Sequence, residues 1–329
     1  MKLSRLGEFG LIDRISRKVT VGPGVRLGIG DDAAWVDHPR GSSLITADLL
    51  IEGIHFELKW TTLVDLGYKS LAVNLSDIAA MGGVPAYVML SIGIPQNFDS
   101  KKIDQLYRGI GSLANKHGVT IIGGDTNIAE SLLISVCVIG DPPAQPVRRA
   151  GARVGDDLYV TGTLGDSALG LVLLREPQRV NSRAVKQLIA RHHRPTPRLA
   201  AGALLAKRKL ASAMIDVSDG LIQDLGHICQ MSGVGATIEQ DKLPLSSAYR
   251  ALAGKNGMSY ALSGGEDYEL LFSAPARLRK RIQALRKKAG VTISRIGICT
   301  PASKGIQLID STGSNIALRG QGHDHFKKN

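Results

Sequence analysis

Cysteine, aromatic residues and long apolar runs are all scarce in this 329-residue chain. The three cysteines, Cys137, Cys229 and Cys299, are isolated in apolar surroundings, which argues against a disulfide framework or a cysteine metal site and favours the reduced thiols of a cytoplasmic protein. The longest apolar stretches, such as 86–95 and 132–140, fall far short of the roughly 20 residues that cross a membrane. The N-terminal residues carry a charge early and have no apolar core, so we expect no signal peptide and no membrane partner.

Familiar motifs of nucleotide enzymes and hydrolases are also absent. The chain has no Gly-x-x-x-x-Gly-Lys-[Ser/Thr] phosphate loop, no protein-kinase catalytic loop and no Gly-x-Ser-x-Gly nucleophile elbow. Segment 28–33 lacks the third glycine of the dinucleotide fingerprint. The pairs His192–His193 and His323–His325 have no partner at zinc-ligand spacing, so we favour non-metal roles for them.

The excess of basic residues is typical of proteins that bind nucleic acids, but the arrangement of the charges does not support a nucleic-acid partner. There are 41 basic and 29 acidic residues, a formal charge of +12. In segment 277–288, Leu278, Ile282 and Leu285 recur at helical spacing and leave the cations facing outward. Aromatics, which an RNA-binding surface interleaves with its cations, make up only 4% and are scattered. We therefore expect no nucleic-acid partner, keep a basic RNA-binding module as an alternative, and expect the basic surface to attract ATP.

The chain length and a proline-rich break predict two domains. Hydrophobic residues are 43% and charged residues 21%, as in ordinary globular proteins, and segment 141–146 carries three prolines that end any strand or helix. Strand and helix patterns alternate on both sides, so we expect a mixed α/β (α+β) fold with domains at 1–141 and 147–329. The expected strands are 43–46, 87–94, 119–122, 132–139, 157–161, 213–216, 236–239, 260–263 and 269–273.

Acidic residues recur where apolar runs end, beside glycines. The segments that share this pattern are 28–32, 45–48, 75–78, 121–127, 214–220 and 262–267. In α/β sheets ligands bind at that end of the strands, and converging carboxylates need a cation to offset their repulsion. An oxygen-only set favours Mg²⁺ over zinc or copper, and the glycines let the backbone approach phosphate oxygens. Each segment alone is often a plain turn; together they predict a site for phosphate chemistry.

The clearest helix, 64–81, supports this interpretation. It is closed by Gly82 and Gly83. Leu71, Leu75 and Ile78 form its core stripe, and Asp77 belongs to the neighbouring stripe. We therefore expect Asp77 at the rim of the core.

At three motifs the chain resembles the thiamine-monophosphate kinase family. They are Leu-Ala-Val-Asn-Leu-Ser-Asp-Ile-Ala-Ala-Met-Gly at 71–82, Asp-Val-Ser-Asp-Gly-Leu at 216–221 and Ser-Gly-Gly-Glu-Asp-Tyr-Glu-Leu-Leu-Phe at 263–272. The resemblance runs from 7–12 to 322–326 and implies the fold of aminoimidazole ribonucleotide synthetase, selenophosphate synthetase and a hydrogenase-maturation enzyme. It further implies an N-terminal domain that binds metal and ATP and forms a β-barrel across a homodimer, and a C-terminal domain that completes the nucleotide and substrate site.

The same resemblance implies an activity and a set of site residues. The activity is ATP-dependent phosphorylation of thiamine monophosphate to thiamine diphosphate by direct in-line transfer, with several Mg²⁺ ions and with K⁺ allowed for. Metal ligands map onto Asp32, Thr46, Asp48, Asp77, Asp125, Asp216 and Asp219. ATP contacts map onto Tyr107, Gly124, Asp125, Arg149 and Ser218, and substrate contacts onto His55, Glu266 and His323. Asp77, Asp125 and Asp216 are the expected catalytic centre.

Two departures from the family pattern keep alternatives open. Ala47 stands where the family usually has threonine, and His323 where an aromatic residue is usual, which leaves a degenerate, non-catalytic relative as one alternative. Another ATP-dependent enzyme of the same fold is the nearest rival. A selenophosphate synthetase needs a reactive cysteine early in the chain, whereas the first here is Cys137, and segment 263–272 fits a purine-precursor synthetase less well.

Overall fold

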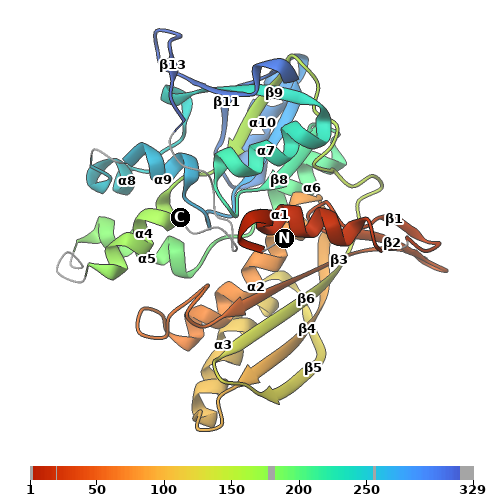
Figure 1. Cartoon of the computed structure of the whole chain (residues 1–329), viewed down its shortest axis with the longest axis vertical. Helices are drawn as coiled ribbons and strands as arrows, with labels where there is room; N and C mark the ends of the chain where they lie inside the picture. Colours follow the sequence, from red (N-terminus) through yellow and green to blue (C-terminus); the bar gives the residue numbers. More distant parts are fainter. Residues whose placement is uncertain (1–2, 20, 177–181, 255–256, 319–329) are drawn as a thin grey trace.

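The computed structural model describes residues 3–19, 21–176, 182–254 and 257–318, and every structural statement below concerns these residues. Two β-sheets lie one above the other, the N-terminal sheet below and the C-terminal sheet above in Figure 1. Both sheets are open, since no strand order closes on itself. Within the described ranges, no helix has the length and apolarity needed to cross a membrane.

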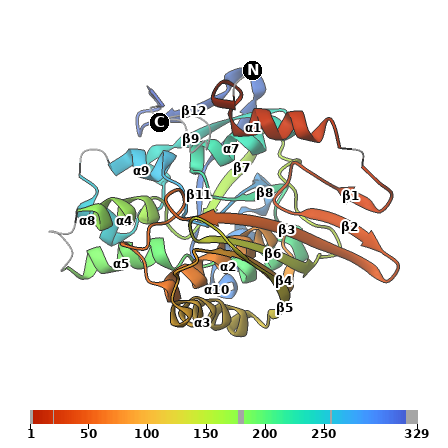
Figure 2. The ribbon, with the colours of Figure 1, turned by 60° about the horizontal axis from the view of Figure 1, so that its bottom comes forward.

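The N-terminal sheet has six strands in the order β1-β2-β3-β6-β4-β5. All neighbouring strands are antiparallel except the parallel pair β4 and β5. The strands are β1 (Val25–Leu27), β2 (Ala34–His38), β3 (Gly41–Ile51), β4 (Val84–Ile94), β5 (Thr120–Ile128) and β6 (Leu133–Asp141). Figures 1 and 2 both place β5 at the end of the molecule remote from β9.

One face of this sheet is covered by α2 (Leu63–Ala80) and α3 (Ser100–His117). Alternation along β4 decides which face is covered: Val88, Leu90 and Ile92 are buried with the helices, while Tyr87 and Met89 are exposed on the other face. Thr62 caps α2 by accepting a hydrogen bond from the Asp65 amide. The sheet therefore has one buried face and one exposed face.

The C-terminal sheet has seven strands in the order β13-β12-β9-β11-β7-β10-β8. Its strands are β7 (Asp156–Thr161), β8 (Ala213–Asp216), β9 (Val234–Glu239), β10 (Leu270–Pro275), β11 (Ile293–Pro301), β12 (Ile306–Ile309) and β13 (Asn315–Ile316). The remaining helices are α1 (Leu3–Ser16), α4 (Asp166–Arg175), α5 (Arg183–His193), α6 (Leu199–Lys207), α7 (Leu221–Ser232), α8 (Ser247–Leu252), α9 (Gly257–Ser263) and α10 (Arg279–Ala289).

Both faces of this second sheet are buried. Strand β7 is buried along its whole length: Leu158 and Val160 belong to the core formed with α4, α5 and α7, and Tyr159 belongs to the core formed with α6 and α10. A strand covered on both sides has a continuous apolar run, here residues 158–160 of β7 and 213–215 of β8.

Helix α2 joins the two halves of the molecule. Its C-terminal residues Ala79 and Ala80 lie in the core of the second sheet, beside α6. A Cβ at Gly202 would lie 2.0 Å from the Ala79 carbonyl oxygen, so only glycine permits this helix contact. The side chains of α2 consequently face residues of both halves.

Most of the expected elements are observed, and one is wrong. The predicted helix 64–81 corresponds to α2, and the strands predicted over 213–216 and 157–161 are β8 and β7. The strand predicted over 260–263 is instead the end of α9, where Ala261 and Leu262 are buried in the second core. A short apolar run does not distinguish a strand from one buried helical turn.

Candidate active site

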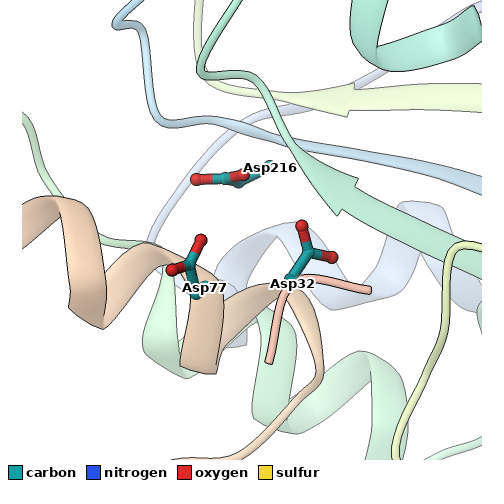
Figure 3. A group of neighbouring side chains, drawn as sticks. All are labelled: Asp32, Asp77 and Asp216. Carbon is teal, nitrogen blue, oxygen red and sulfur yellow. The ribbon is translucent and has the colours of Figure 1, made fainter. Parts of the chain in front are cut away.

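Three aspartate side chains converge between the two sheets. Asp32 follows β1 in a loop, Asp77 lies on α2, and Asp216 ends β8. Each offers a carboxylate oxygen within 4.8 Å of the others, and Figure 3 shows the three groups pointing toward one another. Residues nearly 200 positions apart in the sequence thus form one acidic group, as we expected from the pattern of carboxylates.

Strand β3 holds α2 in register beside this group. The Thr46 hydroxyl donates to a carboxylate oxygen of Asp77 at 2.6 Å. Two residues on, the Asp48 amide donates to the Asn74 side-chain oxygen at 3.0 Å. Thr46 and Asp48 therefore lie next to Asp77, on the buried face of the strand, where the resemblance assigned further metal ligands.

Arg149 is the basic residue that contacts the group. Its Nη2 lies 2.7 Å from an Asp32 carboxylate oxygen, and its backbone amide donates to both oxygens of Asp31 at 3.2 Å. The Asp32 side chain is fully buried. One guanidinium thus offsets part of the negative charge, and the remainder has no cation of the described chain against it.

Burial and mutual repulsion raise the pKa of these carboxyl groups. Burial, followed by the charges of Asp48, Asp216 and Asp32, holds the pKa of Asp77 well above its ordinary value. Burial, followed by Asp32, raises the pKa of Asp216 to about 8. The fold therefore disfavours full ionisation of the group unless a bound cation compensates.

The donor atoms fit Mg²⁺. Asp32 Oδ2 and Asp216 Oδ2 are buried without any hydrogen-bond partner among the described residues, and such oxygens normally have one. The neighbouring groups are carboxylates and a hydroxyl, the oxygen ligands that Mg²⁺ prefers. Asp32, Asp77 and Asp216, with Thr46 and Asp48 beside them, are thus suited to hold hard divalent cations.

Two loops of the second half complete the surroundings of Asp216. The Glu266 amide donates to the Ser218 carbonyl at 2.7 Å, and the Tyr268 amide donates to the Val217 carbonyl at 2.8 Å. The Gln223 side chain donates to Asp219 at 3.0 Å. Ser218 and Asp219 therefore lie beside the acidic group, and Glu266 is fixed to the same loop.

A pocket of about 130 Å³ opens between the two halves. Residues of the loop after β3 line one side, and residues of α2, α4 and α5 line the other; they include His55, Glu57, Trp60, Lys69, Arg175 and His192. His55 is oriented by the Ile51 amide, which donates to its Nδ1 at 3.1 Å. His55, which the resemblance assigned as a substrate contact, thus lines this pocket.

Three expected site residues are not brought to the group of carboxylates. Asp125 and Gly124 lie on β5, the exposed edge strand, where Asp125 accepts a hydrogen bond from Asn127 at 2.7 Å. A Cβ at Gly124 would lie 1.6 Å from the Leu90 carbonyl oxygen, so glycine is required there for strand pairing. Tyr107 packs on α3 against the N-terminal core. The roles of these residues stay predictions, and His323 lies outside the described residues.

Sequence reasoning did not place Lys69 or His192 at the pocket that both of them line. Lys69 is buried, with 5% of its surface exposed, and is the one basic residue of the apolar helix α2. That position was a detectable signal, because lysine is almost never buried without a partner. His192, for which the sequence favoured a non-metal role, also lines the pocket.

Comparisons with known proteins first define the class. Residues 30–141 match the N-terminal domain of AIR synthase related protein, and residues 153–309 match the C-terminal domain of the same class. Together the two matches cover most of the chain.

Individual relatives then identify the family within this class. A thiamine-monophosphate kinase of Salmonella typhimurium is 41% identical over 97% of this chain and 98% of its own. The solved structure of AaThiL complexed with AMPPCP and TMP is 34% identical with a TM-score of 0.85 and covers 99% of both chains. A thiamine-monophosphate kinase structure from Stenotrophomonas maltophilia is 39% identical with a TM-score of 0.77 and covers 92% of this chain and 96% of its own. The chain belongs to the thiamine-monophosphate kinase family.

Proposed function

We propose that this protein transfers the γ-phosphoryl group of ATP to thiamine monophosphate and so makes thiamine diphosphate. The observation that carries the proposal is the convergence of Asp32, Asp77 and Asp216. His55, the expected substrate contact, lines a pocket between the two halves of the molecule. The AaThiL relative, which was solved with AMPPCP and TMP, supports the same pair of substrates.

The transfer needs positioning and charge compensation more than a protein nucleophile. A phosphate oxygen of thiamine monophosphate attacks the γ-phosphorus and forms a new P–O bond. The bond from that phosphorus to the β,γ-bridging oxygen breaks, and ADP leaves with the electron pair. The acceptor phosphate is already deprotonated near neutral pH, so no general base is required. Arg149, beside Asp32, is placed to steady phosphate charge.

Mg²⁺ is the proposed cofactor, held by Asp32, Asp77 and Asp216 with Thr46, Asp48 and Asp219 nearby. When bound, it supplies positive charge to the phosphates of both substrates. The proposal extends to the two parts of the chain: residues 1–141 bind metal and ATP and form the dimer, and residues 147–329 complete the nucleotide and substrate site. Asp125 and K⁺ belong to this proposal as a further ligand and a further cation.

The direct test is an assay with ATP, Mg²⁺ and thiamine monophosphate, with thiamine as the control acceptor. We expect thiamine diphosphate and ADP in equal amounts, no product from thiamine, and no turnover once Mg²⁺ is chelated. Repeating the assay in sodium instead of potassium salts tests the role of K⁺. Absence of thiamine diphosphate from the complete mixture would refute the proposed activity.

Trp60 offers a test of where the substrate binds. The chain has two tryptophans: Trp60 lines the pocket, while Trp35 lies on β2 with Arg26 over its ring. In a Trp35→Phe variant we expect thiamine monophosphate to quench the remaining emission, because its cationic ring would lie against Trp60. The matched Trp60→Phe variant should show no quenching. Unchanged Trp60 emission at a substrate concentration that saturates turnover would place the substrate elsewhere.

The exposed face of the N-terminal sheet supports a homodimer in which paired sheets form the expected barrel. Large apolar side chains are exposed on this face, namely Leu49, Tyr87 and Met89, and further ones are exposed on the edge strand β5, namely Ile121, Ile122 and Ile128. Strand β5 has no neighbour on its outer edge within the described chain. Both features favour association.

The dimer makes a simple prediction about Met89. We expect Met89→Asp to convert the dimer to a monomer, because a charge would be buried in the apolar contact. Light scattering after size exclusion measures the mass directly. The matched control is Met231→Asp, which changes a similarly exposed methionine on α7 and should leave the dimer intact. A monomeric wild-type protein, or a dimeric Met89→Asp variant, would contradict this arrangement.

A further inference from the structure

The loop that carries Glu266 has an unusual backbone. Glu266 and Tyr268 have φ angles of 66° and 51°, in the left-handed region that residues other than glycine rarely occupy. Such conformations persist only where the surroundings over-determine them, and they gather at functional sites. The two backbone hydrogen bonds to residues 217 and 218 are one part of that constraint.

Asp267, between these two residues, anchors the loop on its other side. Its buried carboxylate accepts hydrogen bonds from the amides of Gly165 at 2.6 Å and Ser167 at 3.2 Å, at the start of α4. Helix N-termini favour such an acceptor. With Asp267 fixed to α4, the side chain of Glu266 is held near α2 and α5.

Lys69 supplies the first contact that Glu266 makes there. Its Nζ lies 2.6 Å from Glu266 Oε1, and the two side chains are 6% and 30% exposed. No other ion pair of Lys69 occurs among the described residues. A buried ammonium group of this kind requires a carboxylate partner. The pair links a helix of the N-terminal half to a loop of the C-terminal half.

His192 supplies the second contact. Its Nδ1 lies 3.2 Å from Glu266 Oε2 and 3.0 Å from the Ser167 hydroxyl. Burial, followed by the charge of Lys69, lowers the pKa of His192 to about 3, so the ring is neutral. We place its proton on Nδ1, because the carboxylate beside it can only accept. Ser167 thereby links the two residues: its amide donates to Asp267 and its hydroxyl contacts His192.

Lys69 keeps Glu266 ionised. Burial alone would raise the pKa of its carboxyl group, but the ammonium group of Lys69 beside it lowers the pKa. Lys69 contacts one carboxylate oxygen of Glu266, Oε1, and His192 contacts the other, Oε2. With 30% of the side chain exposed, the carboxylate can still accept a hydrogen bond from a ligand next to the pocket that Lys69, His192 and His55 line.

We propose that Lys69 and His192 are positioning residues that hold the ionised Glu266 carboxylate in place to bind the cationic, amino-substituted heterocycle of the substrate. The inference rests on the proposed function, because the heterocycle is that of thiamine monophosphate. Lys69 also balances the charge of Glu266 when the pocket is empty. The network therefore acts on the affinity for the acceptor substrate. It does not act on the phosphoryl-transfer step at Asp77.

The test compares Lys69→Met, which keeps the stem and removes the charge, with Lys69→Arg, which keeps the charge. We expect Lys69→Met to raise KM for thiamine monophosphate at least about tenfold, since one partner of a buried charge pair is lost. The kcat and the KM for ATP should stay within about threefold, because an effect on substrate binding alone leaves the transfer step unchanged. Lys69→Arg should restore most of the affinity. Lys101→Met, an exposed lysine on α3, is the matched control and should match wild type.

A merely structural Lys69 would give a different pattern. Equal changes in kcat and in both KM values, with no rescue by arginine, would overturn the inference. If Lys69→Met does not fold, Glu266→Gln and His192→Asn decide: the first must raise KM for thiamine monophosphate selectively, and the second, which keeps a donor near Nδ1, must raise it less. An unselective effect of Glu266→Gln would also overturn it. A wild-type protein that gives no thiamine diphosphate would instead refute the proposed function itself.

Discussion

Asp77→Asn is expected to lower turnover about 10³-fold or more, the cost of removing one preorganised electrostatic group from a transfer site. Asp77 is the centre of the acidic group, because the charges of Asp48, Asp216 and Asp32 all act on it and Thr46 donates to it. Asparagine keeps the shape and can still accept from Thr46, but it removes the negative charge that a divalent cation needs. Steady-state kinetics at increasing Mg²⁺ concentration measure the loss.

The same change should stabilise the metal-free protein. The pKa of Asp77 is raised on folding, so the native state binds its proton more tightly than the unfolded state does. The stability of metal-free wild type therefore falls as the pH rises above about 4, the carboxyl pKa of an unfolded chain, and that loss continues up to the raised pKa. Asparagine removes this penalty, so the variant's Tm without metal should exceed that of wild type at pH 8 and match it more closely at pH 4.

Asp104→Asn is the matched control for this experiment. Asp104 is exposed on α3 and does not belong to the acidic group, so neither turnover nor Tm should change. Near-normal turnover of the Asp77→Asn variant would contradict the assignment of the carboxylate group as the metal site. A variant that is less stable than wild type without metal would show that the repulsion among these carboxylates is small.

The site could be predicted from the sequence where a local pattern carried the information. Asp32, Asp77 and Asp216 each follow an apolar run, and the edges of sheets and helices bring such positions together. Helix α2 was predictable because its apolar stripe has helical spacing and glycines follow it. The motifs at 71–82, 216–221 and 263–272 then gave the family.

The rest depends on contacts that no local pattern encodes. Lys69 and Glu266 are nearly 200 residues apart, and only the packing of α2 against the second half brings them together. The short apolar run at 260–263 became helix because α9 packs on α4 and α7. Asp125 lies on an exposed edge strand, so its predicted role depends on partners or ligands beyond the single chain.

Glu269→Ala should produce the largest loss of stability, about 3–5 kcal/mol, as expected when one partner of a buried ionic cluster is removed. Glu269 is fully buried and lies immediately before β10. Its carboxylate accepts from Arg191 at 2.7 Å, from Thr161 at 2.7 Å and from Arg198 at 2.6 Å. Alanine would leave two mostly buried guanidinium groups, 19% and 15% exposed, without their anion.

Chemical denaturation of the metal-free protein measures this loss, and Glu239→Ala is the matched control. Glu239 pairs with Arg295, but both side chains are about one-third exposed, so its removal should cost no more than about 1 kcal/mol. The Val217 amide donates to the Glu269 carbonyl at 2.8 Å, which ties this cluster to the loop of Asp216 and Ser218. Loss of the cluster should therefore weaken substrate binding at temperatures below global unfolding. An equal effect of the two substitutions would mean that the arginines are solvated well enough to need no buried anion.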